Sequence, residues 1–180
     1  GSGLVGSEMC IRDSTAAVWK DSGINSIKDL NNKNVAVTSG TTAVALLKKF
    51  EKDNGIKIRY LMTKDFAESM QLVAKKRAAA FVIDDVLLAG QISNLPNPQD
   101  FKIVDASLSV EPYAPMFAKD DPAFKALVDK TIVGMMKDGT LDKLYKKWFE
   151  SPIPPKNANL NFPMNSVTKE LFANPNSDGI

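Results

Sequence analysis

Between residues 26 and 105, the apolar positions of the chain follow two alternating periods. Short apolar or alternating runs, typical of β-strands, lie at 35–38, 56–62, 78–83 and 101–104. Between these runs, apolar residues recur every three or four positions and predict helices over 43–52, from residue 65 and from residue 84. Regular alternation of strands and helices predicts an α/β unit with a mainly parallel sheet.

The pattern changes after residue 110. Pro112 lacks the N–H that a central strand donates, so residues 111–113 are not expected in a central strand. One more short strand is expected over 114–119. Helical spacing then predicts helices over 122–137, 140–149 and 166–172. The first two have large apolar faces that need a sheet to cover them: either they pack on the first unit, or part of their own lobe is missing.

Composition narrows the classes of function. The 180 residues suffice for one domain or two small lobes, and the net charge of +2 gives no reason to expect nucleic acid as a partner. The absence of histidine excludes Ser-His-Asp catalysis and histidine metal sites. A single cysteine, Cys10, excludes an internal disulfide and thiolate metal clusters. We expect no metal and no cofactor, and no apolar run approaches the ~20 residues of a membrane helix.

Residues 1–14, GSGLVGSEMCIRDS, differ in composition from the rest of the chain and show no periodicity. They resemble translated adapter sequence at a broken reading frame, and we expect them to be foreign to the protein. The alternative is a short native strand and turn. No secretory signal peptide is recognisable in them. Cys10 lies inside this segment and is therefore assigned no role.

One candidate site is the turn formed by Ser39, Gly40, Thr41 and Thr42, between a strand and the start of a helix. Ligands of open α/β sheets bind at the carboxyl ends of strands. Free backbone N–H groups, the positive end of the helix dipole and two threonine hydroxyls together suit a carboxylate. The alternative is a helix cap with a glycine for a tight turn.

A second candidate is Asp84, directly after the apolar run 78–83. A carboxylate at the end of a buried strand is well placed to accept hydrogen bonds from an ammonium group, although it can equally cap the following helix. Together, the turn and Asp84 would suit an α-amino acid. Asp84 and Asp85 are not expected to act as an acid–base pair, because adjacent residues at a helix start diverge.

Other conspicuous residues have simpler interpretations. The basic runs at 48–49, 75–77 and 146–147 are typical of solvated faces. Trp148 and Phe149 have the spacing of residues that pack in a core.

Five stretches, at 21–42, 78–90, 108–129, 139–149 and 151–162, resemble bacterial polar-amino-acid-binding proteins, the family 3 receptors of ABC importers. They include NVAVTSGTT, AAAFVIDDVLLAG and SPIPPKN, and they look most like the glutamate/aspartate-binding members. The resemblance implies a type II periplasmic-binding-protein fold with two α/β lobes joined by crossing strands. It implies the second lobe over 15–106, a hinge crossing over 107–113, and the C-terminal part of the first lobe with a tail over 114–180.

The resemblance also implies roles for the candidate residues. Thr42 would donate to the ligand carboxylate, assisted by Thr41 and the amides of Ser39 and Gly40, and Asp84 would receive the α-ammonium group. The position of Phe66 resembles one that a ligand-contacting histidine holds in dicarboxylate receptors. Phe66 donates no hydrogen bond, so a ligand's side-chain carboxylate would lose a partner worth ~1–3 kcal/mol. A less polar or aromatic ligand therefore stays open.

The family's first lobe would precede this region by ~100 residues and would supply an arginine that clamps the ligand carboxylate. We therefore expect the chain to be a fragment. The expected function is binding of a polar or acidic amino acid by a monomer in the periplasm, or lipid-anchored outside the cell, and delivery to an ABC permease without catalysis. Regulator or sensor domains, and dehydratase-like enzymes, use the same fold and are the alternatives.

Overall fold

The computed structural model describes residues 4–6, 10–118, 120–154 and 157–175. The chain divides into two compact units. One unit is Asp13–Val110, and the other combines Gly1–Arg12 with Glu111–Ile180. The first unit therefore starts two residues before residue 15, where the sequence predicts that the second lobe begins. It ends at Val110, within the range 107–113 that is predicted for the hinge crossing.

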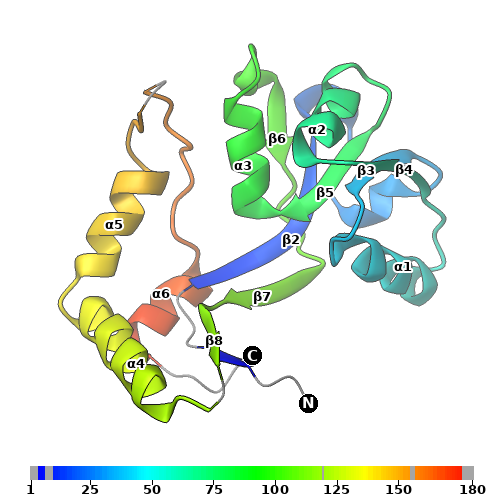
Figure 1. Cartoon of the computed structure of the whole chain (residues 1–180). Helices are drawn as coiled ribbons and strands as arrows, with labels where there is room; N and C mark the ends of the chain where they lie inside the picture. Colours follow the sequence, from blue (N-terminus) through cyan, green and yellow to red (C-terminus); the bar gives the residue numbers. More distant parts are fainter. Residues whose placement is uncertain (1–3, 7–9, 119, 155–156, 176–180) are drawn as a thin grey trace. The chain divides into compact units, whose positions relative to one another are not determined.

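The unit Asp13–Val110 is built on one sheet with the strand order β4-β3-β5-β2-β6 (Figure 1). Its strands are β2 Cys10–Trp19, β3 Asn34–Thr38, β4 Arg59–Thr63, β5 Ala80–Asp84 and β6 Phe101–Ile103. Strands β4, β3 and β5 are parallel to one another, whereas β2 is antiparallel to both β5 and β6. The predicted α/β class is confirmed, but the sheet is mixed rather than mainly parallel, because β2 runs antiparallel between β5 and β6.

Helices cover both faces of this sheet because its strands are apolar on both sides. Val35 and Val37 of β3 belong to one buried cluster with Leu47 of α1, whereas Ala36 belongs to a second cluster with Met70 of α2. Strand β5 is buried throughout, as its uninterrupted apolar run predicts. The helices are α1 Ala43–Asn54, α2 Phe66–Ala74 and α3 Asp85–Ser93, and short 3₁₀ turns lie at Lys20–Ser22, Ile27–Leu30 and Pro98–Asp100.

Most expected element boundaries agree with the structure to within two residues, and two differ more clearly. Strand β4 begins at Arg59 and not at residue 56. Strand β2 runs from Cys10 across the expected boundary at residue 14. Pro112 lies in a strand that the sequence does not predict, β7 Ser109–Tyr113, but this strand is off the main strand path and pairs with β2, so Pro112 is not in a central strand, as expected. Proline is tolerated there because such a strand need not donate on both sides.

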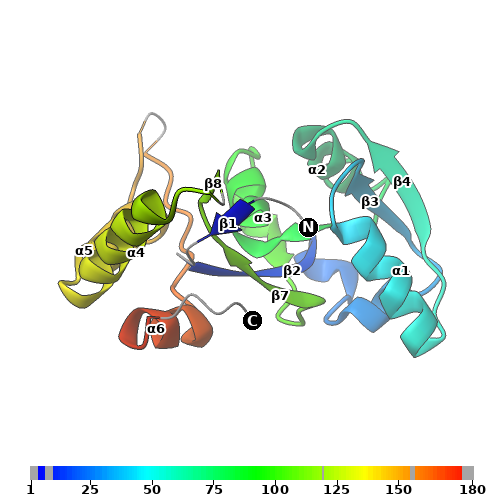
Figure 2. The same cartoon turned by 60° about the horizontal axis from the view of Figure 1, so that its bottom comes forward.

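The second unit is mainly helical in its described part. It contains α4 Pro122–Lys137, α5 Thr140–Phe149, α6 Ser166–Ala173 and an antiparallel pair of short strands, β1 Leu4–Gly6 and β8 Met116–Ala118 (Figure 2). Asp121 and Asn165 cap α4 and α6 by accepting from the backbone N–H groups of Phe124 and Thr168.

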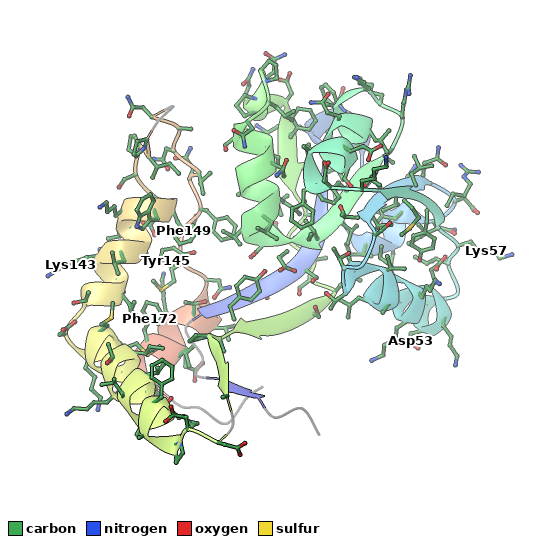
Figure 3. The ribbon with its side chains drawn as sticks, viewed as in Figure 1. Asp53, Lys57, Lys143, Tyr145, Phe149 and Phe172 are labelled. Atoms are coloured by element: carbon green, nitrogen blue, oxygen red, sulfur yellow. The ribbon has the colours of Figure 1, made fainter. Side chains whose placement is uncertain are left out.

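A small core holds these helices. The rings of Tyr145 and Phe149, both on α5, lie 4.5 Å apart between centroids, and Phe172 of α6 joins the same cluster (Figure 3). Trp148 does not follow the expectation of core packing, because 45% of its surface is exposed. Helical spacing identifies an apolar face but not whether anything covers it.

Candidate functional site

The carboxyl ends of β3, β4 and β5 meet at one edge of the sheet, because these three strands are parallel. The loop of residues 39–42 follows β3, Phe66 opens the helix after β4, and Asp84 ends β5. Neighbouring parallel strands lie about 4.8 Å apart. The fold therefore brings all the predicted site residues to the same edge of one unit.

The loop after β3 is held in place by three local features. The backbone N–H of Ser39 donates to the carbonyl of Thr63 at 3.1 Å, and the hydroxyl of Thr41 donates to the carbonyl of Thr38 at 2.8 Å. Gly40 has φ +81°, a left-handed conformation that glycine adopts without strain. The loop amides that begin α1 are thus presented at the sheet edge in a defined conformation.

Thr42 does not act as a side-chain cap. It occupies the N-cap position of α1 with helical backbone angles, its hydroxyl makes no cap hydrogen bond, and its side chain is exposed. Thr41, in contrast, already uses its hydroxyl proton within the loop. The Thr42 hydroxyl is therefore not engaged as a helix cap, whereas the Thr41 hydroxyl is engaged within the loop.

Asp84 also differs from a capping residue. It is 9% exposed, stands at the N-cap position of α3, and makes no cap hydrogen bond through its side chain. Its Oδ1 accepts from the hydroxyl of Ser14 at 3.1 Å. The neighbouring Asp85 accepts from the N–H of Val86, so the two adjacent carboxylates are engaged differently, as expected.

Ser14 is one of the residues that sequence reasoning missed. It lies on β2 directly opposite Asp84 in the antiparallel register and is 1% exposed. No local signal identifies it, because 70 residues separate the two partners. Ser14 also belongs to residues 1–14, the segment that we expect to be foreign to the protein. That expectation stays a prediction.

A buried group of three hydroxyls also lies behind the loop. Thr38 ends β3, Thr63 ends β4 and Ser69 lies on α2. Their oxygens are joined at 3.0 Å for Thr38–Ser69 and 2.5 Å for Thr63–Ser69. The group links three elements that carry the candidate site. The sequence could have indicated Thr38 and Thr63, because both end predicted strands. The position of Ser69 on a helix gives no such indication.

Phe66 contributes an apolar wall at this edge. It is half-buried at the first position of α2, and its ring lies 6.3 Å from that of Phe81 in the sheet. Asp65 caps the start of α2, because its Oδ1 accepts a hydrogen bond from the N–H of Glu68.

One further acid lies near this edge, Asp13 on β2. Its Oδ1 is buried and has no hydrogen-bond partner among the described residues. Burial raises the pKa of the Asp13 carboxyl above its usual range.

Among the described residues there is no cluster of three or more metal-ligating side chains, and no helix long and apolar enough to cross a membrane.

Comparison with known proteins finds relatives among solute-binding proteins. The chain is 40% identical over 161 residues to the glutamate/aspartate import solute-binding protein of Escherichia coli (strain K12), covering 89% of this chain and 53% of that protein. It is 41% identical over 156 residues to the L-glutamate/L-aspartate-binding protein of Pseudomonas aeruginosa, covering 87% and 52%. The chain thus spans about half the length of these curated relatives.

Solved structures show the same fold. An ancestral arginine-binding protein bound to arginine has a TM-score of 0.67 at 32% identity, covering 81% of this chain and 64% of that one. The GluR0 ligand-binding core with L-glutamate has a TM-score of 0.70 at 19% identity, covering 82% and 65%. These are type II periplasmic-binding-protein folds, as the sequence predicts. The family model for bacterial extracellular solute-binding proteins, family 3, matches residues 30–151, and the chain belongs to that family.

Proposed function

We propose that this chain contains the second lobe, and part of the first, of a receptor that binds a polar or acidic L-amino acid. The receptor would act as a monomer outside the cytoplasmic membrane and deliver its ligand to an ABC importer. One observation carries the proposal. A loop with an exposed hydroxyl and helix-end amides, at Thr42, lies one strand away from a buried carboxylate, Asp84.

The chemistry of the two groups matches the two charges that every α-amino acid shares. The amides and the hydroxyl at the start of α1 donate hydrogen bonds, and the helix dipole adds a positive potential, which together favour a carboxylate. Asp84 offers acceptor oxygens for an ammonium group.

The relatives' names supply the ligand class. Two of them are named for glutamate and aspartate, and at about 40% identity they support an acidic ligand for this chain. Phe66 argues for a change in how the ligand's side chain is held, since a phenyl ring in van der Waals contact replaces any hydrogen-bond donor there. We expect glutamate or a similar amino acid to bind, with part of its side chain against Phe66.

Transport requires more than one lobe. In this proposal the ligand closes the two lobes around itself, and closure is a population shift driven by contacts made only in the closed state. The closed form is what the permease would recognise. The 180-residue chain alone should therefore bind weakly.

The test uses the protein extended to the full length of its relatives. Titration calorimetry with glutamate should show at least tenfold weaker binding, about 1.4 kcal/mol, for each of Asp84→Ala and Thr42→Val. Asp53→Asn removes an exposed carboxylate on α1, away from the sheet edge, and should leave the affinity unchanged. Unchanged affinity in both site variants would contradict the assignment. Loss of folding, checked by circular dichroism, would require Asp84→Asn in its place.

A further inference from the structure

Side chains tie together the strand pair β3–β4 at the end that carries the candidate site. The hydroxyls of Thr38, Thr63 and Ser69 meet there, and all three residues are buried. The oxygen of Ser69 lies 3.0 Å from that of Thr38 and 2.5 Å from that of Thr63. We call these three residues the hydroxyl cluster. The cluster joins the last residues of two parallel strands to α2.

Each hydroxyl has one proton to donate, and one order of hydrogen bonds uses all three protons. The Thr63 hydroxyl lies 3.3 Å from the carbonyl of Val37 and 3.2 Å from that of Asp65. A carbonyl only accepts, so Thr63 donates outward to one of these two groups. Ser69 then donates to Thr63, and Thr38 donates to Ser69. Every proton of the cluster has an acceptor in this order.

The loop of residues 39–42 is attached to the same two strand ends. The N–H of Ser39 donates to the carbonyl of Thr63, and the hydroxyl of Thr41 donates to the carbonyl of Thr38. A shift of the end of β3 against the end of β4 therefore moves the two attachments of the loop relative to each other. The side chains that resist this shift belong to the residues whose carbonyls hold the loop.

The third member of the cluster extends this connection to the apolar wall of the candidate site. Ser69 lies three residues after Phe66 on α2, a spacing that makes the two residues neighbours on the helix surface. The cluster thus links the loop of residues 39–42 to the helix that carries Phe66.

Packing alone does not require hydroxyls at these positions. Valine has the shape of threonine, and alanine lacks only the oxygen atom of serine, so apolar residues would fill almost the same space. Replacing both partners of a buried hydrogen bond by apolar groups of the same shape can be nearly neutral for stability. The property that the hydroxyls add is direction, because a fully satisfied buried network makes the structure around it more rigid.

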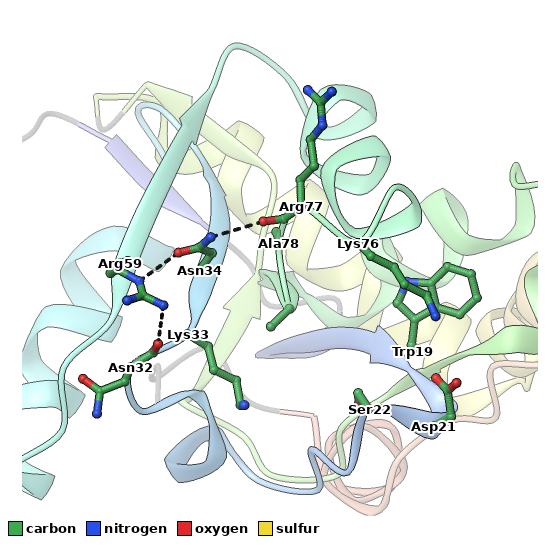
Figure 4. A pocket seen from close by; sticks show the side chains of 11 residues that line it. Trp19, Asp21, Ser22, Asn32, Lys33, Asn34, Arg59, Lys76, Arg77 and Ala78 are labelled. Carbon is green, nitrogen blue, oxygen red and sulfur yellow. Dashed lines mark hydrogen bonds between the residues drawn. The ribbon is translucent and has the colours of Figure 1, made fainter.

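The opposite end of the same strand pair is held differently. There, Nε of Arg59 donates to Oδ1 of Asn34 at 2.9 Å, and one Nη donates to the carbonyl of Asn32 at 2.7 Å (Figure 4). These contacts are exposed to solvent, so water competes with them. The strand pair thus has a buried connection at the end of the candidate site and an exposed one at the other end, which provides a matched control.

We propose that the hydroxyl cluster is a positioning device, which holds the loop of residues 39–42 in the conformation that receives a ligand carboxylate. The proposal rests on the proposed function for the ligand, whereas the holding of the loop needs no ligand. Thr38, Thr63 and Ser69 act through the loop and are not ligand contacts, since their side chains are buried. A loop that is already ordered spares the binding free energy the cost of ordering it.

Amide hydrogen exchange, followed by NMR in the 180-residue chain, tests the holding of the loop. Thr38→Val keeps the shape of the side chain and removes the first donor of the cluster. Ser69 keeps Thr63 as its acceptor, so the unfolding midpoint should stay unchanged. The N–H of Ser39 should exchange about tenfold faster, because its bond to the strand end opens more often. The N–H of Arg59, at the opposite end of the strand pair, should keep its exchange rate.

Matched variants separate the hydroxyl from packing. Thr38→Ser keeps the hydroxyl and should keep the N–H of Ser39 protected. Arg59→Ala removes the exposed connection at the opposite end and should also leave this N–H protected. If Thr38→Val does not fold, Thr38→Ala takes its place, because it differs from Thr38→Ser only in the hydroxyl. Parental protection in the variant without the hydroxyl, or equal acceleration in Thr38→Ser or Arg59→Ala, overturns the proposal.

Titration calorimetry with glutamate connects the loop to binding, in the protein extended to the full length of its relatives. Thr38→Val should weaken binding about tenfold, whereas Thr38→Ser and Arg59→Ala should bind as the parent does. Unchanged affinity in Thr38→Val would overturn the positioning role even if the N–H of Ser39 exchanges faster. Absence of binding by the parent would contradict the proposed function alone, because the exchange experiment tests the holding of the loop without a ligand.

Discussion

The two units of the chain use similar apolar sequence patterns but bury them to different extents. In Asp13–Val110, two clusters fill both faces of a sheet. In the other unit, the buried cluster consists of Met136, Tyr145, Met164, Leu171 and Phe172. Of the seven large apolar side chains exposed in the described part of the chain, five belong to the helical unit: Phe124, Leu127, Leu144, Trp148 and Val167.

This difference teaches that helix formation and helix burial depend on different parts of the sequence. Helices α4 and α5 form from their own spacing and end signals, such as the Asp121 cap and the left-handed Gly139. Their faces stay exposed in the described part of the chain because no sheet of this unit covers them. That agrees with the expectation that these helices need further strands, and it suggests matched substitutions in the two units.

The largest contrast is expected between two phenylalanines. Phe81 is 0% exposed in β5, and Phe124 is 47% exposed on α4. Phe81→Ala should lower the free energy of unfolding by about 3–5 kcal/mol, because it removes buried contacts and leaves a cavity. Phe124→Ala should change it by less than about 0.5 kcal/mol. Urea denaturation followed by Trp19 fluorescence, in a Trp148→Phe background, measures the unit of Phe81, and far-ultraviolet circular dichroism of the same samples follows the helical unit of Phe124.

Equal losses in the two variants would contradict the comparison. They would show that the exposed face of α4 is covered in solution, for example by a second copy of the chain. Analytical ultracentrifugation of both variants would then distinguish a covering partner from a local rearrangement of α4.

A smaller contrast is expected between two hydroxyls. Ser69 is buried and contacts Thr38 and Thr63, so Ser69→Ala leaves buried polar groups short of a partner and should cost about 1–3 kcal/mol. Thr131 is exposed on α4 and donates to the carbonyl of Leu127. Thr131→Ala should change the unfolding free energy by no more than about 0.5 kcal/mol. Thermal denaturation followed by circular dichroism compares the two, and a cost below that of Thr131→Ala would rule out a stabilising role for the Ser69 hydroxyl.

Much of this organisation could be predicted from the sequence, for physical reasons that particular residues illustrate. The apolar run of β5 identifies a strand buried on both faces, and the polar residue at its end, Asp84, marks the sheet edge at which we propose that the ligand binds. Both inferences use signals within a few residues of one another. The cap at Asp65 is predictable for the same reason.

Other features arise only when distant segments meet. Ser14 contacts Asp84 across 70 positions, and one surface depression is lined by Trp19 at the end of β2 together with Lys33 and Lys76 from two connections. The run 75–77 is therefore typical of a solvated face in sequence, although the fold places Lys76 over an indole ring. Trp148 is the opposite case. Its helical spacing predicts that it packs in a core, but its burial depends on other segments of the chain that would have to cover it.

A third prediction concerns the apolar surface itself. Leu127 is 60% exposed, so Leu127→Glu should leave the unfolding free energy within about 0.5 kcal/mol while lowering binding of a hydrophobic dye and any self-association. Dye fluorescence and light scattering measure this variant. Unchanged dye binding in Leu127→Glu would show that the exposed residues of α4 do not form the dye-accessible surface.

The smallest effects, and the most selective, are expected from two aspartates whose pKa values shift in opposite directions. Burial raises the pKa of Asp13, in the sheet unit, whereas hydrogen bonds from the side chain and backbone of Thr140 lower the pKa of Asp138, between α4 and α5. A raised pKa means that the folded state holds the proton more tightly than the unfolded state. The contribution of Asp13 is then fully favourable below its ordinary pKa of 3.8 and is lost as pH rises through the folded value. For Asp138 the contribution is present above the ordinary pKa and is lost as pH falls.

Asp13→Asn should therefore raise the unfolding midpoint slightly at pH 7, and Asp138→Asn should lower it slightly. Both differences should shrink toward pH 3, and thermal denaturation between pH 3 and pH 7 measures them. Midpoint shifts of the same sign at pH 7 would show that the carboxyl of Asp13 is hydrated in solution, which would remove the distinction between a buried acid in the sheet unit and a hydrogen-bonded one in the helical unit.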